Sequence, residues 1–349
     1  MKKFFKSPLL PLPKRIHASH WLYWLLLLTT CALPGTGAST EKMPVAGPLL
    51  RIESGMHTSM LRRVGMDAEE RYLFSIADDK TLRVWSMENG RLLLTFRVPI
   101  GLTTEGSLFA LAISPDGRTV AVSGQTCPEW DDTYCIYLID VKSGKLRRRI
   151  TNLPEAVTHL AFSPTGTYLA ATFGEKAGLR VYGIPDGAPV YLGEPYNVPA
   201  NWVDFAPDGR LVTSAYDGML RLYDASFRLL LVKQLARLSK PYGVAFSPDG
   251  TKVAVGFRDR NTVAVLSGSD LSLLYLPDVT GVQNHLWVVA WSRDGRTLYG
   301  GGGHLDKGRY LIRWWSQAGE ANQQGRGEYI DVPASRATVT HLLALQSGG

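Results

Sequence analysis

The sequence has little of what membrane proteins and most enzymes show. Its longest apolar-biased run, residues 21–32, has 12 residues, whereas a membrane-spanning helix needs about 20. No helical hydrophobic period extends along the chain. Three catalytic signatures are also missing: Gly-x-Ser-x-Gly, His-Glu-x-x-His and the phosphate-binding Gly-x-x-x-x-Gly-Lys. These absences argue against a stable membrane span and against the enzyme classes that those motifs mark.

The first 38 residues have the order of a secretory signal. Five basic residues and no acid precede or adjoin the apolar run, and Thr36-Gly37-Ala38 supplies small residues for a cleavage site. We predict a signal peptide over residues 1–38 and a secreted or periplasmic mature protein. Two alternatives stay open. One is an uncleaved anchor, and the other is a lipoprotein, because Leu28-Thr29-Thr30-Cys31 resembles a lipoprotein box with a poorly fitting threonine before its cysteine.

The basic character of the chain comes from that leader. The whole sequence has 38 Lys and Arg against 31 Asp and Glu, a formal charge of +7, and removing the five basic leader residues leaves about +2. No basic stripe interleaved with aromatic residues follows. We therefore expect no nucleic-acid partner and no stable membrane span after leader removal.

Only two cysteines, Cys127 and Cys135, follow the leader. Exported proteins meet oxidising conditions, and a metal site would need further Cys or His at ligand spacing nearby. We predict a disulfide between Cys127 and Cys135. Two free thiols are the alternative.

A four-residue turn recurs along the chain. It reads Ser-Pro-Asp-Gly or a close variant and closes at Gly117, Gly166, Gly209, Gly250 and Gly295, which lie 49, 43, 41 and 45 residues apart. This spacing is the period of a four-stranded propeller blade. Between the turns, short apolar strands are joined by tight connections such as Glu88-Asn89-Gly90, and Asn-Gly between apolar runs is a strong hairpin signal. The sequence therefore predicts an all-β propeller.

The repeats resemble the WD40 family over nearly the whole chain after the leader. The dipeptide that ends that family's third strand occurs in altered form as Trp85-Ser86, Ile139-Asp140, Tyr182-Gly183, Tyr223-Asp224, Leu266-Ser267 and Trp315-Ser316. The family's buried network of His, Ser or Thr, Asp and Trp matches only in the first repeat, at His57, Ser75, Asp79 and Trp85. Within the family, the chain resembles exported bacterial members with degenerate repeats.

The resemblance implies a ring of seven blades. Repeats are expected near residues 57–98, 107–150, 157–192, 201–234, 241–275 and 286–318, with a partial seventh at 339–349 that stops at its first turn. WD40 rings usually close with an outer strand from the N-terminus, and Pro48–Ile52 stands where that strand is expected. We predict a seven-bladed propeller over residues 39–349 whose last blade is incomplete.

Three polar features have both a structural and a functional interpretation. The run Tyr299–His304 is a flexible inter-strand loop or an anion cradle, and Glu129, Asp131 and Asp132 form a solvated loop tip or a calcium site. Histidines from different repeats lack metal-ligand spacing, although inner strands could bring some into one channel: His57, His159, His285, His304 and His341. We predict no catalytic residue, cofactor or metal site.

Aligning the repeats on their turns gives candidate binding residues. One position holds Arg62, Phe109, Thr158, Asn201, Tyr242, Trp287 and His341, and the next holds Arg63, Ala110, His159, Trp202, Gly243, Val288 and Leu342. Arg and large aromatics are enriched at interaction hot spots. Together with Trp130, from an insertion expected on the same side, we predict a partner-binding face of Arg62, Phe109, Trp130, Asn201, Tyr242, Trp287 and His341. The alternative is that Phe109 and Trp287 only pack between blades.

The leading functional hypothesis is a non-catalytic scaffold that binds a protein or peptide outside the cytoplasm. In bacterial chains that this one resembles, a propeller is sometimes fused to an enzymatic domain such as a caspase-like peptidase. A missing C-terminal catalytic domain beyond Gly349 is therefore one alternative. The other is a periplasmic propeller enzyme, redox protein or sugar- or peptide-binding protein with its site in the central channel.

The export hypothesis predicts that mature protein begins near Ser39. The basic start, the short apolar run and the small residues at 36–38 are the features that signal peptidase reads. N-terminal sequencing of protein from the exported fraction measures the start. An intact Met1 in a soluble cytosolic product would contradict the prediction.

Overall fold

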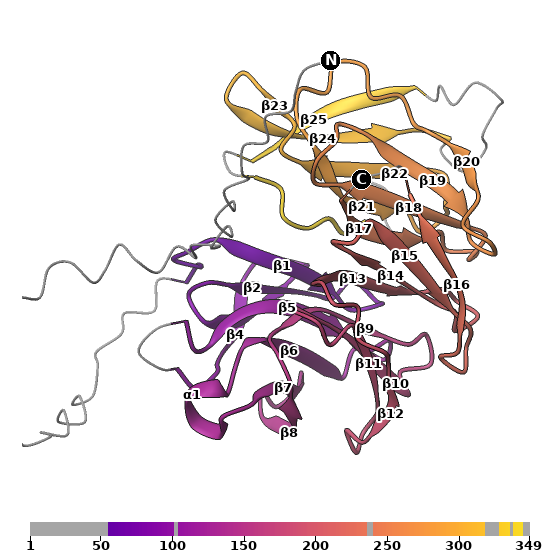
Figure 1. Ribbon diagram of the computed structural model, residues 1–349. Coiled ribbons are helices and arrows are strands. Elements are labelled where there is room, and N and C mark those ends of the chain that lie inside the picture. Colours follow the sequence, from indigo (N-terminus) through magenta and orange to yellow (C-terminus); the bar gives the residue numbers. More distant parts are fainter. Residues whose placement is uncertain (1–54, 101–103, 236–239, 318–327, 336–337, 345–349) are drawn as a thin grey trace, which may run out of the picture. The chain divides into compact units, whose positions relative to one another are not determined.

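The computed structural model describes residues 55–100, 104–235, 240–317, 328–335 and 338–344, without the side chains of Glu129, Trp130 and Ser335. These residues form six antiparallel sheets, each a blade of a β-propeller (Figure 1). The predicted leader and Pro48–Ile52 lie outside the described residues. Within the described ranges, no helix is long and apolar enough to span a membrane.

Five blades are four-stranded meanders in chain order. Blade one contains β1 (Leu61–Met66), β2 (Tyr72–Ala77), β3 (Thr81–Ser86) and β4 (Leu92–Arg97). Blade two contains β5 (Ser107–Ile113), β6 (Thr119–Gln125), the short helix α1 (Pro128–Asp131), β7 (Tyr134–Asp140) and β8 (Leu146–Leu153). Blade three contains β9 (Val157–Phe162), β10 (Tyr168–Phe173), β11 (Leu179–Gly183) and β12 (Pro189–Leu192).

The fourth and fifth blades repeat this plan. Blade four contains β13 (Ala200–Phe205), β14 (Leu211–Ala215), β15 (Met219–Tyr223) and β16 (Leu229–Gln234). Blade five contains β17 (Pro241–Phe246), β18 (Lys252–Phe257), β19 (Val263–Ser267) and β20 (Leu273–Tyr275). The inner strands pack in sequence, β1 on β5, β5 on β9, β9 on β13, β13 on β17 and β17 on β21. The hydrophobic core therefore lies in layers between successive blades.

Blade six corrects the predicted blade count. It contains β21 (Leu286–Trp291), β22 (Leu298–Gly302), β23 (Leu305–Asp306) and β24 (Arg309–Trp315), and β25 (Tyr329–Ser335) pairs with β24. The all-β propeller is confirmed, but seven blades with an incomplete last blade is wrong: the described chain has six. Its last outer strand comes from residues after the expected end of the repeat at 318.

The segment 338–344, expected to begin a seventh blade, forms no strand. It lies between blades six and one, where the Val339 N–H donates to the Gly302 carbonyl at 3.1 Å and the Thr340 hydroxyl donates to the Leu61 carbonyl at 3.0 Å. Val339 is buried. Isolated hydrogen bonds and the apolar contacts of Val339 and Leu342 with the core hold the segment in place of a strand ladder. An apolar pattern therefore occurs here without a strand.

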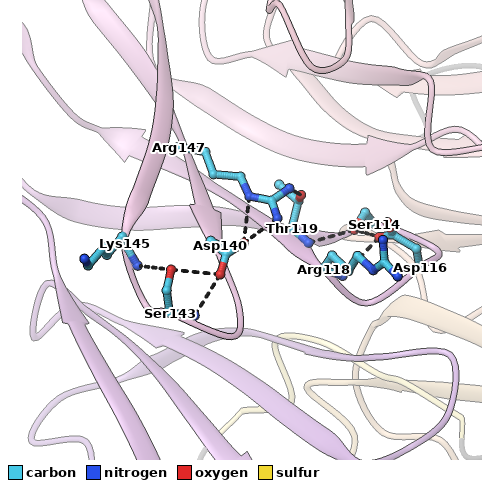
Figure 2. A network of polar contacts seen from close by, with 8 residues as sticks. All are labelled: Ser114, Asp116, Arg118, Thr119, Asp140, Ser143, Lys145 and Arg147. Atoms are coloured by element: carbon cyan, nitrogen blue, oxygen red, sulfur yellow. Dashed lines mark hydrogen bonds and ion pairs between the residues drawn. The ribbon is translucent and has the colours of Figure 1, made fainter.

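The recurring turns are fixed by side chains that hydrogen-bond to the backbone (Figure 2). In blade two, the Ser114 hydroxyl donates to the Asp116 carboxylate at 2.5 Å and accepts from the Thr119 N–H at 2.9 Å. At the end of β7, Asp140 accepts from the Ser143 N–H at 2.7 Å and pairs with Arg147. The N–H and hydroxyl of Ser143, with Arg147, lower the pKa of Asp140 to about 2. The Asp at the end of the third strand thus closes the turn into the fourth.

The buried polar network expected in blade one is present. His57 Nδ1 lies 3.0 Å from Asp79, His57 Nε2 lies 2.7 Å from the Ser75 hydroxyl, and Trp85 Nε1 donates to that hydroxyl at 2.7 Å. The network ties the connection before β1 to β2 and β3. It matters because a buried hydroxyl with two partners is costly to remove.

Blade four holds a variant of this network that the sequence comparison missed. The Tyr196 hydroxyl lies 2.9 Å from the Thr213 hydroxyl and 2.6 Å from the Tyr223 hydroxyl, and the Arg221 guanidinium lies 3.9 Å from the centre of the Tyr196 ring. Burial raises the pKa of Tyr196 to about 12. Tyr replaces both His and Trp, so a search for those residue types does not find it.

The glycine run in Tyr299–His304 is not a flexible loop, because Leu298–Gly302 is strand β22. A Cβ at Gly300 would lie 2.7 Å from the Trp315 ring, and one at Gly302 would lie 2.9 Å from the Trp287 ring. The glycines therefore leave room for two indole rings, and His304, which follows them, is buried.

A disulfide joins Cys127 to Cys135, with the two Cα atoms 5.7 Å apart. Both cysteines are fully buried. The Cys127 N–H donates to the Glu105 carboxylate at 2.6 Å. The bridge therefore closes the insertion that carries α1 against the start of blade two.

We expect Ser75→Ala to lower the free energy of unfolding by about 1–3 kcal/mol, because it leaves Trp85 Nε1 and His57 without their shared partner in a part-buried site. Urea unfolding followed by tryptophan fluorescence measures this. Ser226→Ala, at an exposed position, is the matched control. Equal midpoints for the two variants would show that the network adds no stability.

Candidate functional site

Five of the seven predicted partner-binding residues lie at the start of inner strands, whereas Trp130 lies in α1 and His341 in the segment 338–344. The five contact neighbouring side chains or backbone. The Arg62 guanidinium lies 5.6 Å from the centre of the Phe109 ring and donates to Asp78 at 2.7 Å. The Asn201 amide donates to the Pro241 carbonyl at 2.9 Å. These contacts link blade one to blade two and blade four to blade five. Arg62 and Asn201 therefore contribute to packing between blades as well as to the predicted binding surface.

A second group gathers around a residue that the sequence comparison did not select, Arg258. Its guanidinium lies 4.4 Å from the centre of the Tyr242 ring and 5.7 Å from that of Trp287, and it donates to the Tyr216 hydroxyl at 2.9 Å. We call Tyr216, Tyr242, Arg258 and Trp287 the aromatic rim. Tyr242 and Trp287 are half-buried. Arg258 directly follows β18, where other blades have Asp78, Gly174 or Tyr216, so no repeated residue type marks it.

The alternative hypothesis that Trp287 has only a packing role holds in part. Its ring covers Gly302 and Gly303 of its own blade, while the side chain stays half-buried. Trp130 belongs to α1, but its side chain lies outside the described residues. The structure thus brings Tyr242 and Trp287 together, and leaves the place of Trp130 at this face a prediction.

The centre of the ring is filled by Arg63, His159 and Trp202 from the second aligned position and by His341 from the first. The Arg63 guanidinium lies 4.1 Å from the centre of the Trp202 ring, and the His159 and His341 rings stack on Trp202 at 4.0 and 5.5 Å. Arg63 donates to the carbonyls of Phe109, Thr158 and Thr340. We call Arg63, His159, Trp202 and His341 the central stack. Arg63, His159 and Trp202 are buried, with 5, 7 and 6% of their surface exposed.

The surroundings of the central stack keep its two histidines neutral. Burial, together with the positive charge of Arg63, lowers the pKa of His159 well below its usual value and that of His341 to about 3. Among the described residues His159 Nδ1 has no hydrogen-bond partner. A proton on either ring would place a second positive charge beside Arg63 in a buried site.

One carboxyl group on an inner strand also titrates abnormally. Burial raises the pKa of Asp204 on β13 to about 7, although its carboxylate accepts the Phe246 N–H from β17 at 2.8 Å. A single carboxyl held by a backbone hydrogen bond does not make an acid–base pair. The hypothesis of an enzyme site in the central channel thus has one titrating group, Asp204, but no second group that could act with it.

The five histidines converge only in part. His159 and His341 meet at Trp202, whereas His57 belongs to the blade-one network and His304 lies 3.4 Å from Asp331. Asp131, part of the acidic loop weighed as a calcium site, pairs with Arg149 at 2.8 Å. Over the ranges that the structure describes, no group of three His, Cys, Asp or Glu side chains could hold a metal ion.

We expect His159 and His341 to destabilise the protein as the pH falls below about 6.5, because these histidines are neutral in the folded state and gain protons on unfolding. Asp204 acts in the opposite sense, because its pKa of about 7 in the folded state lets the folded protein bind that proton before the unfolded chain does. A histidine that stays neutral down to pH 5 contributes about 2 kcal/mol to the loss of stability at that pH. His159→Phe keeps a ring on Trp202 and removes one such group. Thermal unfolding from pH 7.5 to 5 should therefore show a smaller loss in the variant. Parallel pH profiles would contradict the assignment.

Comparison with known proteins agrees with this architecture. A family profile described as "WD domain, G-beta repeat" matches residues 195–224. This segment contains Tyr196, Thr213 and Tyr223 of the blade-four network, so the match falls on a repeat without the full His and Trp pattern.

Curated relatives are similar over parts of the chain. "WD repeat-containing protein SL1-17" of Schistosoma mansoni is 28% identical over 159 residues, 45% of this chain and 48% of that protein. "WD repeat-containing protein 91" of Danio rerio is 25% identical over 244 residues, 64% of this chain and 32% of that protein. "Eukaryotic translation initiation factor 3 subunit I" of Coccidioides immitis (strain RS) is 30% identical over 122 residues, 35% of this chain and 32% of that protein. The chain thus spans about half or less of the length of each relative.

A solved structure, "Crystal structure of RRP9 WD40 repeats", matches with a TM-score of 0.69 and 19% identity over 84% of this chain and 86% of that chain. At this identity the likeness concerns the fold alone. Proteins with WD40 propellers typically serve as protein-interaction scaffolds and are generally not enzymes. The repeat matched at residues 195–224, the WD-repeat relatives and the six-bladed fold together make the chain similar to the WD40-repeat family.

Proposed function

We propose that this protein is a non-catalytic scaffold, exported from the cytoplasm, that binds a protein or peptide at the aromatic rim. The observation that carries the proposal is a difference in exposure: side chains at the centre are buried, whereas aromatic side chains at the edge of the same face stay partly exposed. The central stack fills the middle of the ring, while Tyr242 and Trp287 remain half-buried around Arg258.

The chemistry of the aromatic rim suits a protein partner. Tyr, Trp and Arg are the residue types most enriched at interaction hot spots. The rings are held in place by Arg258, which itself bonds to Tyr216, and preorganised side chains lose less entropy when a partner binds. The rim spans blades four to six, so a bound peptide would contact several blades.

The channel enzyme hypothesis has less support. Its site would need access to the centre, and Arg63, His159 and Trp202 are buried there. The export part of the proposal rests on the order of residues 1–38 and agrees with a disulfide in the described chain, since disulfides persist in oxidising compartments.

We expect Trp287→Ala and Tyr242→Ala to reduce capture of a partner from the exported proteome about thirtyfold each, because truncating a hot-spot aromatic costs about 2 kcal/mol. Capture on immobilised protein, quantified by mass spectrometry, measures this. The partner is the protein that wild type retains and both variants lose.

Trp314→Ala is the matched control, since Trp314 is half-buried on β24 and packs on Tyr299, away from the rim. Circular dichroism and thermal unfolding establish that all three variants fold. Equal capture by wild type and both rim variants would place the binding surface elsewhere.

A further inference from the structure

One register position separates blade five from all the others. It lies two residues before the first residue of the WD40-like dipeptide of each third strand and holds Arg83, Tyr137, Arg180, Arg221, Ala264 and Arg313. Five of these side chains are large, and the sixth is a methyl group. Ala264 is therefore the single small residue of the set.

The large side chains fill space beside their blades. Arg221 stacks 3.9 Å from the centre of the Tyr196 ring. Arg313 is buried and donates to both carboxylate oxygens of Asp331, at 2.8 and 2.7 Å, and to the Thr280 carbonyl at 2.7 Å. Tyr137 is buried with its hydroxyl 3.4 Å from Cys127 Sγ. These residues bridge their own blade to the connection beside it.

In blade five no large side chain stands at this position, and Ala264 is itself only 5% exposed. A pocket of about 950 Å³ lies between β16 and blade five and includes Ala264. Its apolar lining comes from Leu235, Phe257, Leu266, Leu271, Leu273 and Leu276. The outer strand β20 has only three residues, so it covers less of the opening than the longer outer strands do. We call this cavity the blade-five pocket.

The polar residues of the blade-five pocket favour an anion. Lys233, Arg260 and His285 line it together with one carboxylate, that of Asp259. Asp259 already accepts the Lys240 N–H at 2.9 Å, which occupies part of its capacity for a cation. The fixed charges of the lining thus sum to one positive charge, and uncharged polar side chains of Gln234, Asn261, Thr262 and Gln283 also line the pocket beside its apolar wall.

We propose that the blade-five pocket binds a small amphipathic carboxylate. The apolar part of the ligand lies against Phe257 and the leucines, and the carboxylate faces Lys233. Pockets of about 300–1,000 Å³ with apolar walls and a few polar groups are typical small-molecule sites. This site is separate from the aromatic rim, so the inference goes beyond the proposed scaffold function.

Isothermal titration with octanoate and dodecanoate, below their micellar concentrations, tests the proposal. Wild type should bind at least one of them saturably at one site per chain. Ala264→Arg restores the residue type of the other blades and should weaken binding at least tenfold. Ala264→Leu fills the same space without charge and serves if the arginine variant does not fold.

Two further measurements distinguish the contribution of charge to binding from that of apolar contact. Lys233→Glu should weaken dodecanoate binding several-fold, and dodecyltrimethylammonium, with the opposite charge, should bind wild type more weakly than dodecanoate does. Leu192→Arg changes an exposed apolar residue on β12, outside the pocket, and should leave binding unchanged.

The proposal is overturned if wild type binds neither carboxylate, if filling the pocket at Ala264 leaves binding unchanged, or if the cationic detergent binds as tightly as dodecanoate. Loss of binding in Leu192→Arg would also overturn the proposal, because the measured heat would then come from ligand bound to exposed apolar strands. None of these outcomes depends on partner capture at the aromatic rim, so this proposal and the scaffold function fail independently.

Discussion

The arrangement of the blades depends on one buried cation, the guanidinium of Arg63. Inner strands meet at the centre of the ring, where carbonyl groups from different blades approach one another without a shared sheet. Arg63 donates to carbonyls of blade two, blade three and the segment 338–344, and its flat face covers Trp202 of blade four. A lysine in its place would supply charge without the planar fork that reaches three acceptors. Burial keeps His159 and His341 neutral, and the charge of Arg63 adds to this effect because both rings share Trp202 with it.

The fold was predictable from the sequence wherever a turn requires particular residues. The Ser-Pro-Asp-Gly turns use the serine hydroxyl and aspartate carboxylate to hold their own backbone, as Ser114 and Asp116 do, and such local chemistry is visible in one sequence. The blade count was not predictable in this way. The outer strand β25 is separated from β24 by an insertion, and the apolar pattern of Val339–Ala344 resembles that of a strand. Whether such a segment pairs depends on neighbours far away in the chain.

The candidate site was predictable to the same limited extent. Alignment on the turns placed Tyr242 and Trp287 in equivalent positions on adjacent blades, and the structure brings them together around Arg258. Arg258 itself escaped because its equivalents in other blades share no chemistry. Alignment also placed His159 and Trp202 at one position, but not the fact that they fill the centre. In the sequence, the blade-five pocket is marked only by Ala264, a small residue where the other blades have a large one. A search for chemical groups does not detect such an absence.

The glycines of β22 have a consequence for how this protein can vary among species. At Gly300 a methyl group would meet the Trp315 ring at 2.7 Å, whereas at Gly302 it would meet the His285 carbonyl oxygen at 2.7 Å as well as the Trp287 ring at 2.9 Å, and the φ of Gly302 is +150°. An ortholog with alanine or serine in place of Gly300 must therefore carry a smaller residue than tryptophan at position 315. Positions 300 and 315 should covary across an alignment, whereas position 302 should stay glycine whatever residue stands at position 287.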